Sequence, residues 1–196
     1  MKNWLQTFAV VTLLALSTSM AQAGSWELDK AHSNIKFNVK HLMVTNVWGN
    51  FDSFDGKISY DQDHPTKGSV EISIDVASID TDNEKRDGHL RSADFFDVEN
   101  YPTITFVSKK IQRSGDGLKM TGALTMHGVT KDVTFDITGP SGPVDFMGTE
   151  KIAASASTTI NRTDFGLNWN KSLETGGVLV GEDVSIVVDI ELDKSK

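Results

Sequence analysis

The sequence predicts an all-β fold, an antiparallel sheet of about eight strands that covers its own apolar side. Apolar and polar residues alternate over most of the chain beyond residue 30, as is typical of strands with one buried face. Short turn sequences, such as Ser-Gly-Asp-Gly at 114–117, separate these alternating runs and favour hairpins. Two longer stretches, 80–101 and 161–178, break the alternation and therefore predict irregular excursions from the sheet.

The first 23 residues have the features of a secretory signal peptide. Lys2 is followed by an apolar run at 8–16 and by the small-x-small sequence Ala21-Gln22-Ala23. This predicts cleavage after Ala23 and a single domain over 24–196. The chain has no cysteine, which excludes both a lipid-anchored lipoprotein and reliance on disulfides. A periplasmic location suits this combination.

The alternating runs define the expected strands in chain order. In the first run Ile35, Phe37, Val39 and His41 share one face. Corresponding runs are expected around 58–60, 70–76, 104–106, 118–126, 133–137, 152–160 and 184–192. Tight turns are expected at 114–117 and 127–128, and Gly-Pro-Ser-Gly-Pro at 139–143 is expected to break the chain.

One-sided strands of this number either form a sandwich or close into a barrel. A barrel of about eight strands is wide enough to be filled by side chains or to hold one small ligand. Alanine, glycine and threonine on the inward faces leave space unfilled, and this favours a cavity over a packed core.

Residues 81–98 predict a short helical insert. Thr81 and Glu84 have the spacing of a capping box, and the pairs Asp82/Arg86 and Asp87/Arg91 have the i,i+4 spacing of helix-stabilising ion pairs. Gly88 limits the helix to one or two turns, after which Phe95, Phe96 and Val98 turn inward. We expect the insert to cover something, in the simplest case one end of the core.

Several ordered motifs resemble the YceI-like, polyisoprenoid-binding family of periplasmic proteins. They include Asp29-x-x-His32-Ser33, Gly49-x-Phe51-x-x-Phe54-x-Gly56, Arg86-Asp87-x-His89-Leu90-Arg91-Ser92-x-Asp94, Tyr101-Pro102 and Asn161-Arg162-x-Asp164-Phe165-Gly166. The similarity spans roughly 26–192.

The resemblance implies an eight-stranded, lipocalin-like antiparallel barrel that carries an isoprenoid lipid, such as a quinone, a polyprenol or a related amphiphile, in an apolar cavity. No catalytic residue, metal ligand or cofactor other than this lipid is expected. The residues expected to contact the ligand are Phe37, Val39, His41, Phe106, Met120, Leu124, Met126, Phe135, Arg162, Phe165, Leu167 and Trp169. Plain core packing is the alternative role for the inward strand residues, and loop fixation is the alternative for Arg162.

Other functions have weaker support in the sequence. The five histidines lack the spacing of a metal site, and Lys85 replaces the glycine that a calcium loop starting at Asp80 would need. An enzyme that acts on the lipid through the polar 80–101 stretch remains the alternative function, and a filled barrel that only binds partners is a third.

The charge of −8 makes nucleic acid and anionic lipid surfaces poor partners on electrostatic grounds. Membrane proteins that handle quinones are natural partners, and homodimerisation is left open.

Overall fold

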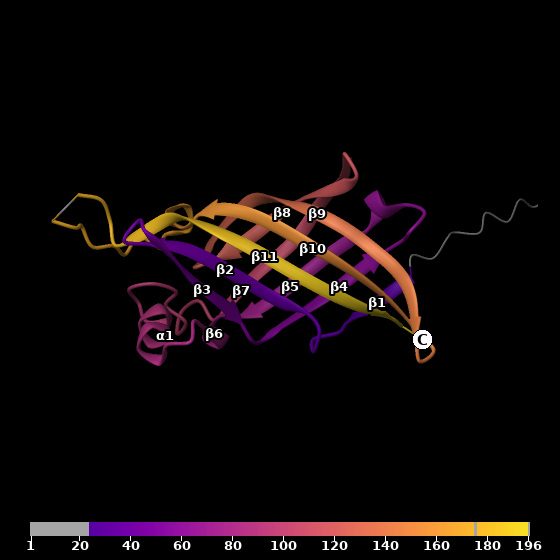
Figure 1. Cartoon of the computed structure of the whole chain (residues 1–196), viewed down its shortest axis with the longest axis horizontal. Coiled ribbons are helices and arrows are strands. Elements are labelled where there is room, and N and C mark those ends of the chain that lie inside the picture. Colours follow the sequence, from indigo (N-terminus) through magenta and orange to yellow (C-terminus); the bar gives the residue numbers. More distant parts are fainter. Residues whose placement is uncertain (1–23, 175, 196) are drawn as a thin grey trace, which may run out of the picture.

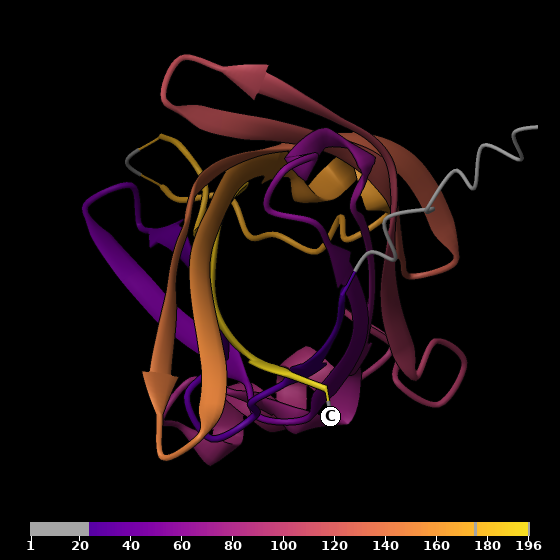
Figure 2. The same ribbon diagram turned by 90° about the vertical axis from the view of Figure 1, so that its right-hand side faces the viewer.

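The computed structural model describes residues 24–174 and 176–195, so the expected signal peptide lies outside the described residues. The chain forms a closed, eight-stranded antiparallel barrel with one short helix (Figures 1 and 2). Its strands are β1 (Gly24–Leu28), β2 (Asn34–His41), β3 (Thr45–Phe51), β4 (Phe54–Tyr60), β5 (Ser69–Asp75), β6 (Ile79–Asp80), β7 (Thr103–Ser114), β8 (Gly117–Met126), β9 (Val129–Phe146), β10 (Thr149–Asn161) and β11 (Val180–Lys194). The predicted barrel is therefore confirmed.

The barrel closes through β11. One edge of β11 pairs with β10 along nearly its full length, and the other edge pairs with β1 at its C-terminal end and with β2 over 180–189. Strands β1 and β2 are thus successive parts of one barrel strand. Strands β4 and β3 beside them, and β5 and β6 beside those, are joined in the same way, so the eleven segments form eight barrel strands. The predicted turns at 114–117 and 127–128 join β7 to β8 and β8 to β9.

Two serines stabilise the barrel where these strands are interrupted. Between β1 and β2, the Ser33 hydroxyl accepts a hydrogen bond from the Glu191 N–H (3.0 Å), and the Asp29 N–H donates to the Glu191 carbonyl (3.0 Å). Between β3 and β4, the Ser78 hydroxyl accepts from the Ser53 N–H (3.0 Å) and donates to the Asp75 carbonyl (2.6 Å). The side chains therefore replace ladder bonds that the bends remove.

The predicted break at 139–143 is wrong, because β9 continues through it. Gly139 and Gly142 adopt positive φ angles of 95° and 107°, and the pairing with β10 shifts register on either side of Ala153. Ser141 still pairs with Ala153. The irregular backbone at these two glycines thus allows two prolines to lie within a strand, although the sequence alone indicated a loop there.

The helical insert exists, but the capping box and the i,i+4 ion pairs predicted for it are wrong. Helix α1 (Glu84–Arg91) is capped by Asn83, whose side chain accepts from the Arg86 N–H (3.0 Å), and not by Thr81. Arg86 donates to the Thr81 carbonyl (2.6 Å), and Arg91 donates to the Ile79 carbonyl (2.7 Å). The charged side chains of α1 hold it against β6 and its flanks instead of pairing along the helix.

Asp87 anchors α1 from inside the protein. It is buried, and its Oδ1 accepts hydrogen bonds from both the N–H (3.0 Å) and the hydroxyl (2.5 Å) of Thr81, which is also buried. A buried carboxyl group in such a position needs both donors, because unpaired polar atoms away from water are costly.

We predict that Asp87→Ala lowers the free energy of unfolding by about 1–3 kcal/mol, because two buried donors of Thr81 lose their acceptor. Glu84→Ala is the control: Glu84 is exposed and would matter only if the capping box existed. Chemical denaturation measures both. An equal loss of stability in the two variants would contradict the assigned roles.

Candidate ligand-binding cavity

The barrel encloses an apolar cavity of about 180 Å³. One water molecule needs only about 10–15 Å³ by this measure, so the space is much larger than a packing defect. The wall consists of Ile35, Phe37, Val39, Phe51, Val70, Ile72, Ile74, Ile104, Phe106, Met120, Leu124, Met126, Phe135, Ala156, Ile160, Val180, Val184, Ile186, Val188 and Ile190, together with Lys36, Leu90, Phe95, Phe96, Arg162 and Leu167. A wall of this composition suits a hydrocarbon chain.

The cavity lies toward one end of the barrel. At the end near β1 and the C-terminus, Leu118, Ile152 and Leu192 are buried, and none of them lines the cavity. At the other end the cavity reaches Val39 and Val180, where β2 pairs with the start of β11. Side chains therefore fill one end of the barrel and leave space toward the other.

The helical insert lies at the spacious end, where Figure 1 shows α1 beside β6. Leu90 from α1 and Phe95 and Phe96 from the segment after it line the cavity, and this confirms that these phenylalanines turn inward. On the opposite side, Arg162 and Leu167 come from η3 (Arg162–Phe165), a short 3₁₀ turn after β10, and its continuation. We call α1 with residues 92–98 the lid.

An aromatic cluster joins the lid to the segment after η3. The His89 ring makes edge-to-face contacts with Phe95 (centroids 5.0 Å apart) and Trp169 (4.8 Å), and Phe95 packs on Trp169 at 5.1 Å. The Nε2 of His89 also lies 3.0 Å from the Asp94 carboxylate. Trp169 therefore packs against the lid and does not line the cavity.

Arg162 is a buried cation whose donors are taken by backbone carbonyls. It donates to the carbonyl oxygens of Gly181 (2.8 Å), Leu167 and Val180 (3.4 Å). Burial lowers the pKa of its guanidinium. These bonds tie the turn after β10 to the start of β11, which fits the loop-fixing alternative, while the side chain also borders the cavity.

Most residues expected to contact a ligand lie on the cavity wall. They are Phe37, Val39, Phe106, Met120, Leu124, Met126, Phe135, Arg162 and Leu167. His41, Phe165 and Trp169 are not on the wall: Phe165 is buried in the core beside it, and His41 ends β2 beyond the last wall residue. Contact of any of these residues with a ligand stays a prediction.

The wall also contains residues to which the sequence analysis gave no ligand role. The largest group, Val184 to Ile190 on β11, was visible as an alternating run, but alternation does not distinguish a wall from a packed core. The expectation that inward glycines leave space unfilled is wrong at Gly49 and Gly122. A Cβ on Gly49 would lie 2.5 Å from the Phe37 ring, and one on Gly122 would lie 2.4 Å from the Phe106 ring. Phenylalanines fill the space that these glycines leave.

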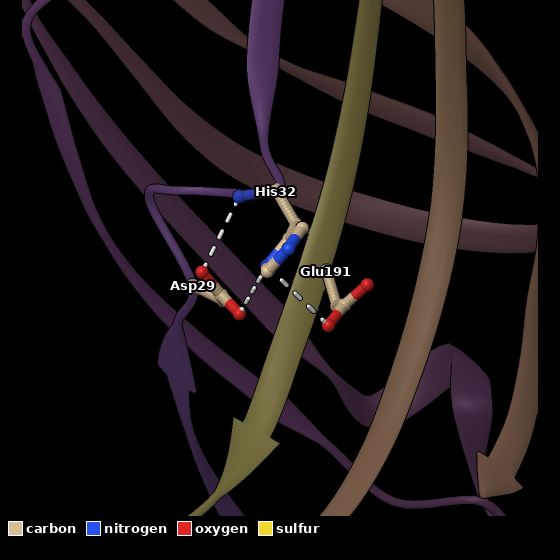
Figure 3. A group of neighbouring side chains, drawn as sticks. All are labelled: Asp29, His32 and Glu191. Carbon is tan, nitrogen blue, oxygen red and sulfur yellow. Dashed lines mark hydrogen bonds and ion pairs between the residues drawn. The ribbon is translucent and has the colours of Figure 1, made fainter.

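A cluster of polar side chains lies outside the cavity, at the interruption between β1 and β2 (Figure 3). His32 Nδ1 donates to the Asp29 carboxylate (2.8 Å) and lies 3.9 Å from Glu191. The Nζ of Lys151 on β10 lies 2.6–3.1 Å from Asp193, Glu191 and Asp29. Asp29, His32 and Glu191 offer three ligand atoms within 4.8 Å of one another, but the ammonium group of Lys151 already supplies a cation there. We call these five residues the seam cluster.

Comparisons with known proteins agree with this architecture. Residues 26–192 match the family model of the YceI-like domain. The chain belongs to the YceI-like family. A UPF0312 protein of Staphylococcus aureus is 39% identical over 175 residues, which are 88% of this chain and 99% of that protein.

Three solved structures share the fold. The Campylobacter jejuni YCEI protein superposes with a TM-score of 0.68 at 34% identity, covering 86% of this chain and 97% of that one. BcnA of Burkholderia cenocepacia gives a TM-score of 0.73 at 26% identity, with 84% and 99% covered. A polyisoprenoid binding domain from Saccharophagus degradans gives 0.63 at 18% identity, with 88% and 99% covered, a likeness of fold alone.

The seam cluster makes stability depend on pH. The hydrogen bond to Asp29 raises the pKa of His32, and the bond from His32 lowers the pKa of Asp29. A raised histidine pKa stabilises the fold fully below the unfolded value of about 6.5 and loses this effect as the pH rises through the folded pKa. Asp29 stays ionised in weak acid, so the pair persists there.

We therefore predict that His32→Ala lowers the melting temperature most near pH 5, and that the difference from the unmodified protein shrinks toward alkaline pH. Thermal scans followed by circular dichroism measure the difference. In an Asp29→Asn background the additional effect of His32→Ala should depend much less on pH, because the hydrogen bond to Asp29 is the largest cause of the raised pKa of His32. A pH-independent effect of His32→Ala in the native background would contradict the assigned pairing.

Proposed function

We propose that this YceI-like chain is a binding protein that carries a long-chain isoprenoid lipid, a quinone, polyprenol or related amphiphile, through the periplasm. The observation that carries the proposal is the cavity, whose wall is apolar along its length and whose spacious end is covered by a lid. The polyisoprenoid binding domain of Saccharophagus degradans has the same fold. The motif resemblance and the features of a signal peptide in residues 1–23 are further support.

The hydrophobic effect accounts for affinity without a specific polar contact. Each buried five-carbon unit contributes about 4 kcal/mol, at about 0.8 kcal/mol per carbon. Association costs roughly 4–15 kcal/mol, and micromolar affinity requires about 8 kcal/mol net. On these values about three to six buried units are sufficient. Because such a tail is insoluble in water, a protein that encloses it keeps it in aqueous solution.

The polar groups of the 80–101 stretch are largely committed to structure. Asp87 accepts from Thr81, and the guanidinium groups of Arg86 and Arg91 donate to backbone carbonyls. His89 contacts Asp94, and both are partly exposed. These interactions favour lid attachment as the role of the stretch, and with it a binding protein over an enzyme acting on the lipid.

We expect the protein purified from periplasm to carry a stoichiometric lipid. Native mass spectrometry should show an adduct, and organic extraction should release molecules whose masses differ by five-carbon units. A protein that is recovered empty and also fails to bind added quinones and polyprenols would contradict the proposal.

Ala156→Phe should weaken lipid binding by about tenfold or more, because the larger side chain enters the cavity where the tail would lie. Ala156 lines the cavity from β10. Ala153→Phe on the same strand is the matched control, because Ala153 is exposed on the outer face. Titration with a fluorescent isoprenoid analogue measures both. Equal affinities in the two variants would show that the ligand does not occupy this part of the barrel.

A further inference from the structure

The hairpin between β2 and β3 ends in an exposed apolar tip. Leu42, Met43 and Val44 are 39%, 54% and 73% exposed, and Trp48 on β3 is 55% exposed. Leu42 and Met43 have positive φ angles of 52° and 61°, in the left-handed region that apolar residues rarely adopt. Tight hairpins favour Asn-Gly at such positions. Neither core packing nor turn geometry therefore explains why these residues are apolar.

The tip lies at the spacious end of the cavity. The Leu42 N–H donates to the Leu179 carbonyl (2.8 Å), so the tip is attached to the segment that enters β11. His41, the residue before the tip, pairs with Val180, which lines the cavity together with Val39. Figure 1 shows α1 at this same end of the barrel. An object bound by the tip would therefore lie at the same end of the barrel as the lid.

A second apolar tip lies at the opposite end, between β9 and β10. Val144, Phe146 and Met147 are 62%, 57% and 91% exposed. This end contains the C-terminal part of β11, where Lys151 pairs with Asp193, and it is the end that side chains fill. Exposed apolar area by itself therefore does not distinguish the two tips.

Charges of both signs surround each tip. Exposed Lys40 precedes the β2–β3 tip and Lys171 lies near it, but the exposed acidic residues Glu182 and Asp183 follow Val180, the partner of His41. At the β9–β10 tip Asp145 stands between the apolar residues, and Glu150 forms an ion pair with Lys194. Charge therefore does not distinguish the tips, and two other features do: the β2–β3 tip lies at the end that the cavity reaches, and it is followed by exposed Trp48.

We propose that the β2–β3 tip docks the protein on a lipid bilayer, inserting Leu42, Met43 and Val44 with Trp48 at the interface. A convex apolar tip flanked by tryptophan and lysine has the composition of interfacial membrane anchors. The placement beside the lid deepens the proposed carrier function and rests on it, because a tail could then pass between bilayer and cavity without crossing water. Docking itself depends only on the tip.

The test is flotation of the chain from Gly24 onward with vesicles of phosphatidylethanolamine and phosphatidylglycerol that contain no isoprenoid. The double variant Met43→Ser/Val44→Ser should reduce the partition coefficient by about tenfold, because it removes the inserted apolar area. The matched control Phe146→Ser/Met147→Ser, at the other tip, should bind vesicles as the unmodified protein does. Both sites are exposed, and thermal scans check that the variants fold.

Trp48 provides a second readout. Its fluorescence should shift to shorter wavelength when vesicles are added, and Trp48→Phe should abolish the shift while vesicle binding persists. No vesicle binding by the unmodified protein, or equal binding by both double variants, would overturn the proposal. So would a loss confined to the β9–β10 variant.

Sedimentation velocity distinguishes docking on a bilayer from self-association. If Met43→Ser/Val44→Ser turns a dimer into a monomer without changing vesicle binding, the tip is an interface between two copies and the proposal is wrong. The vesicles contain no isoprenoid, so docking and carriage fail separately: docking without a lipid adduct contradicts only the carrier function. A lipid adduct without docking contradicts only the inference drawn from the tip.

Discussion

The closure of the barrel by β11 is the constraint on which the rest of the structure depends. One continuous strand pairs with β10 on one side and with both β1 and β2 on the other, and these pairings close the sheet into a barrel. Five residues, 29–33, lie opposite Ile190 and Glu191, and the backbone groups of Glu191 are bonded by Ser33 and Asp29. The Asp-x-x-His-Ser motif is thus the means by which a bent strand stays paired.

The two ends of the barrel differ. Side chains are buried near β1, whereas the cavity reaches Leu90, Phe95 and Phe96 of the lid at the end near α1. The lid is attached by hydrogen bonds at Thr81, Ala77 and Ile79 and by the aromatic contact of His89 with Trp169. It is attached through a few side chains, and not through a continuous ladder. Local opening of the lid therefore costs less free energy than separating a strand from the sheet.

The sequence predicted well those features that depend on local patterns. Alternation located the strands, Gly-containing turns located two hairpins, and the loss of alternation located the insert, because each pattern reflects interactions within a few residues. Local patterns failed where a distant partner decided the outcome. Arg86 and Arg91 have i,i+4 partners in the sequence but donate to the carbonyls of Thr81 and Ile79, and Gly139 and Gly142 keep two prolines within a strand that β10 holds in place.

By itself the sequence determined a strand-rich, one-sided chain with a helical insert and a resemblance to YceI-like proteins, since burial of one strand face imposes a period of two. Only the tertiary structure decided which inward residues surround empty space and which are packed. Gly49 and Gly122 are covered by phenylalanine rings from neighbouring strands, whereas Ala156 faces the cavity. The seam cluster likewise joins residues as distant in the sequence as Asp29 and Asp193, both bound to Lys151. No local pattern relates them, because the register between distant strands places them together.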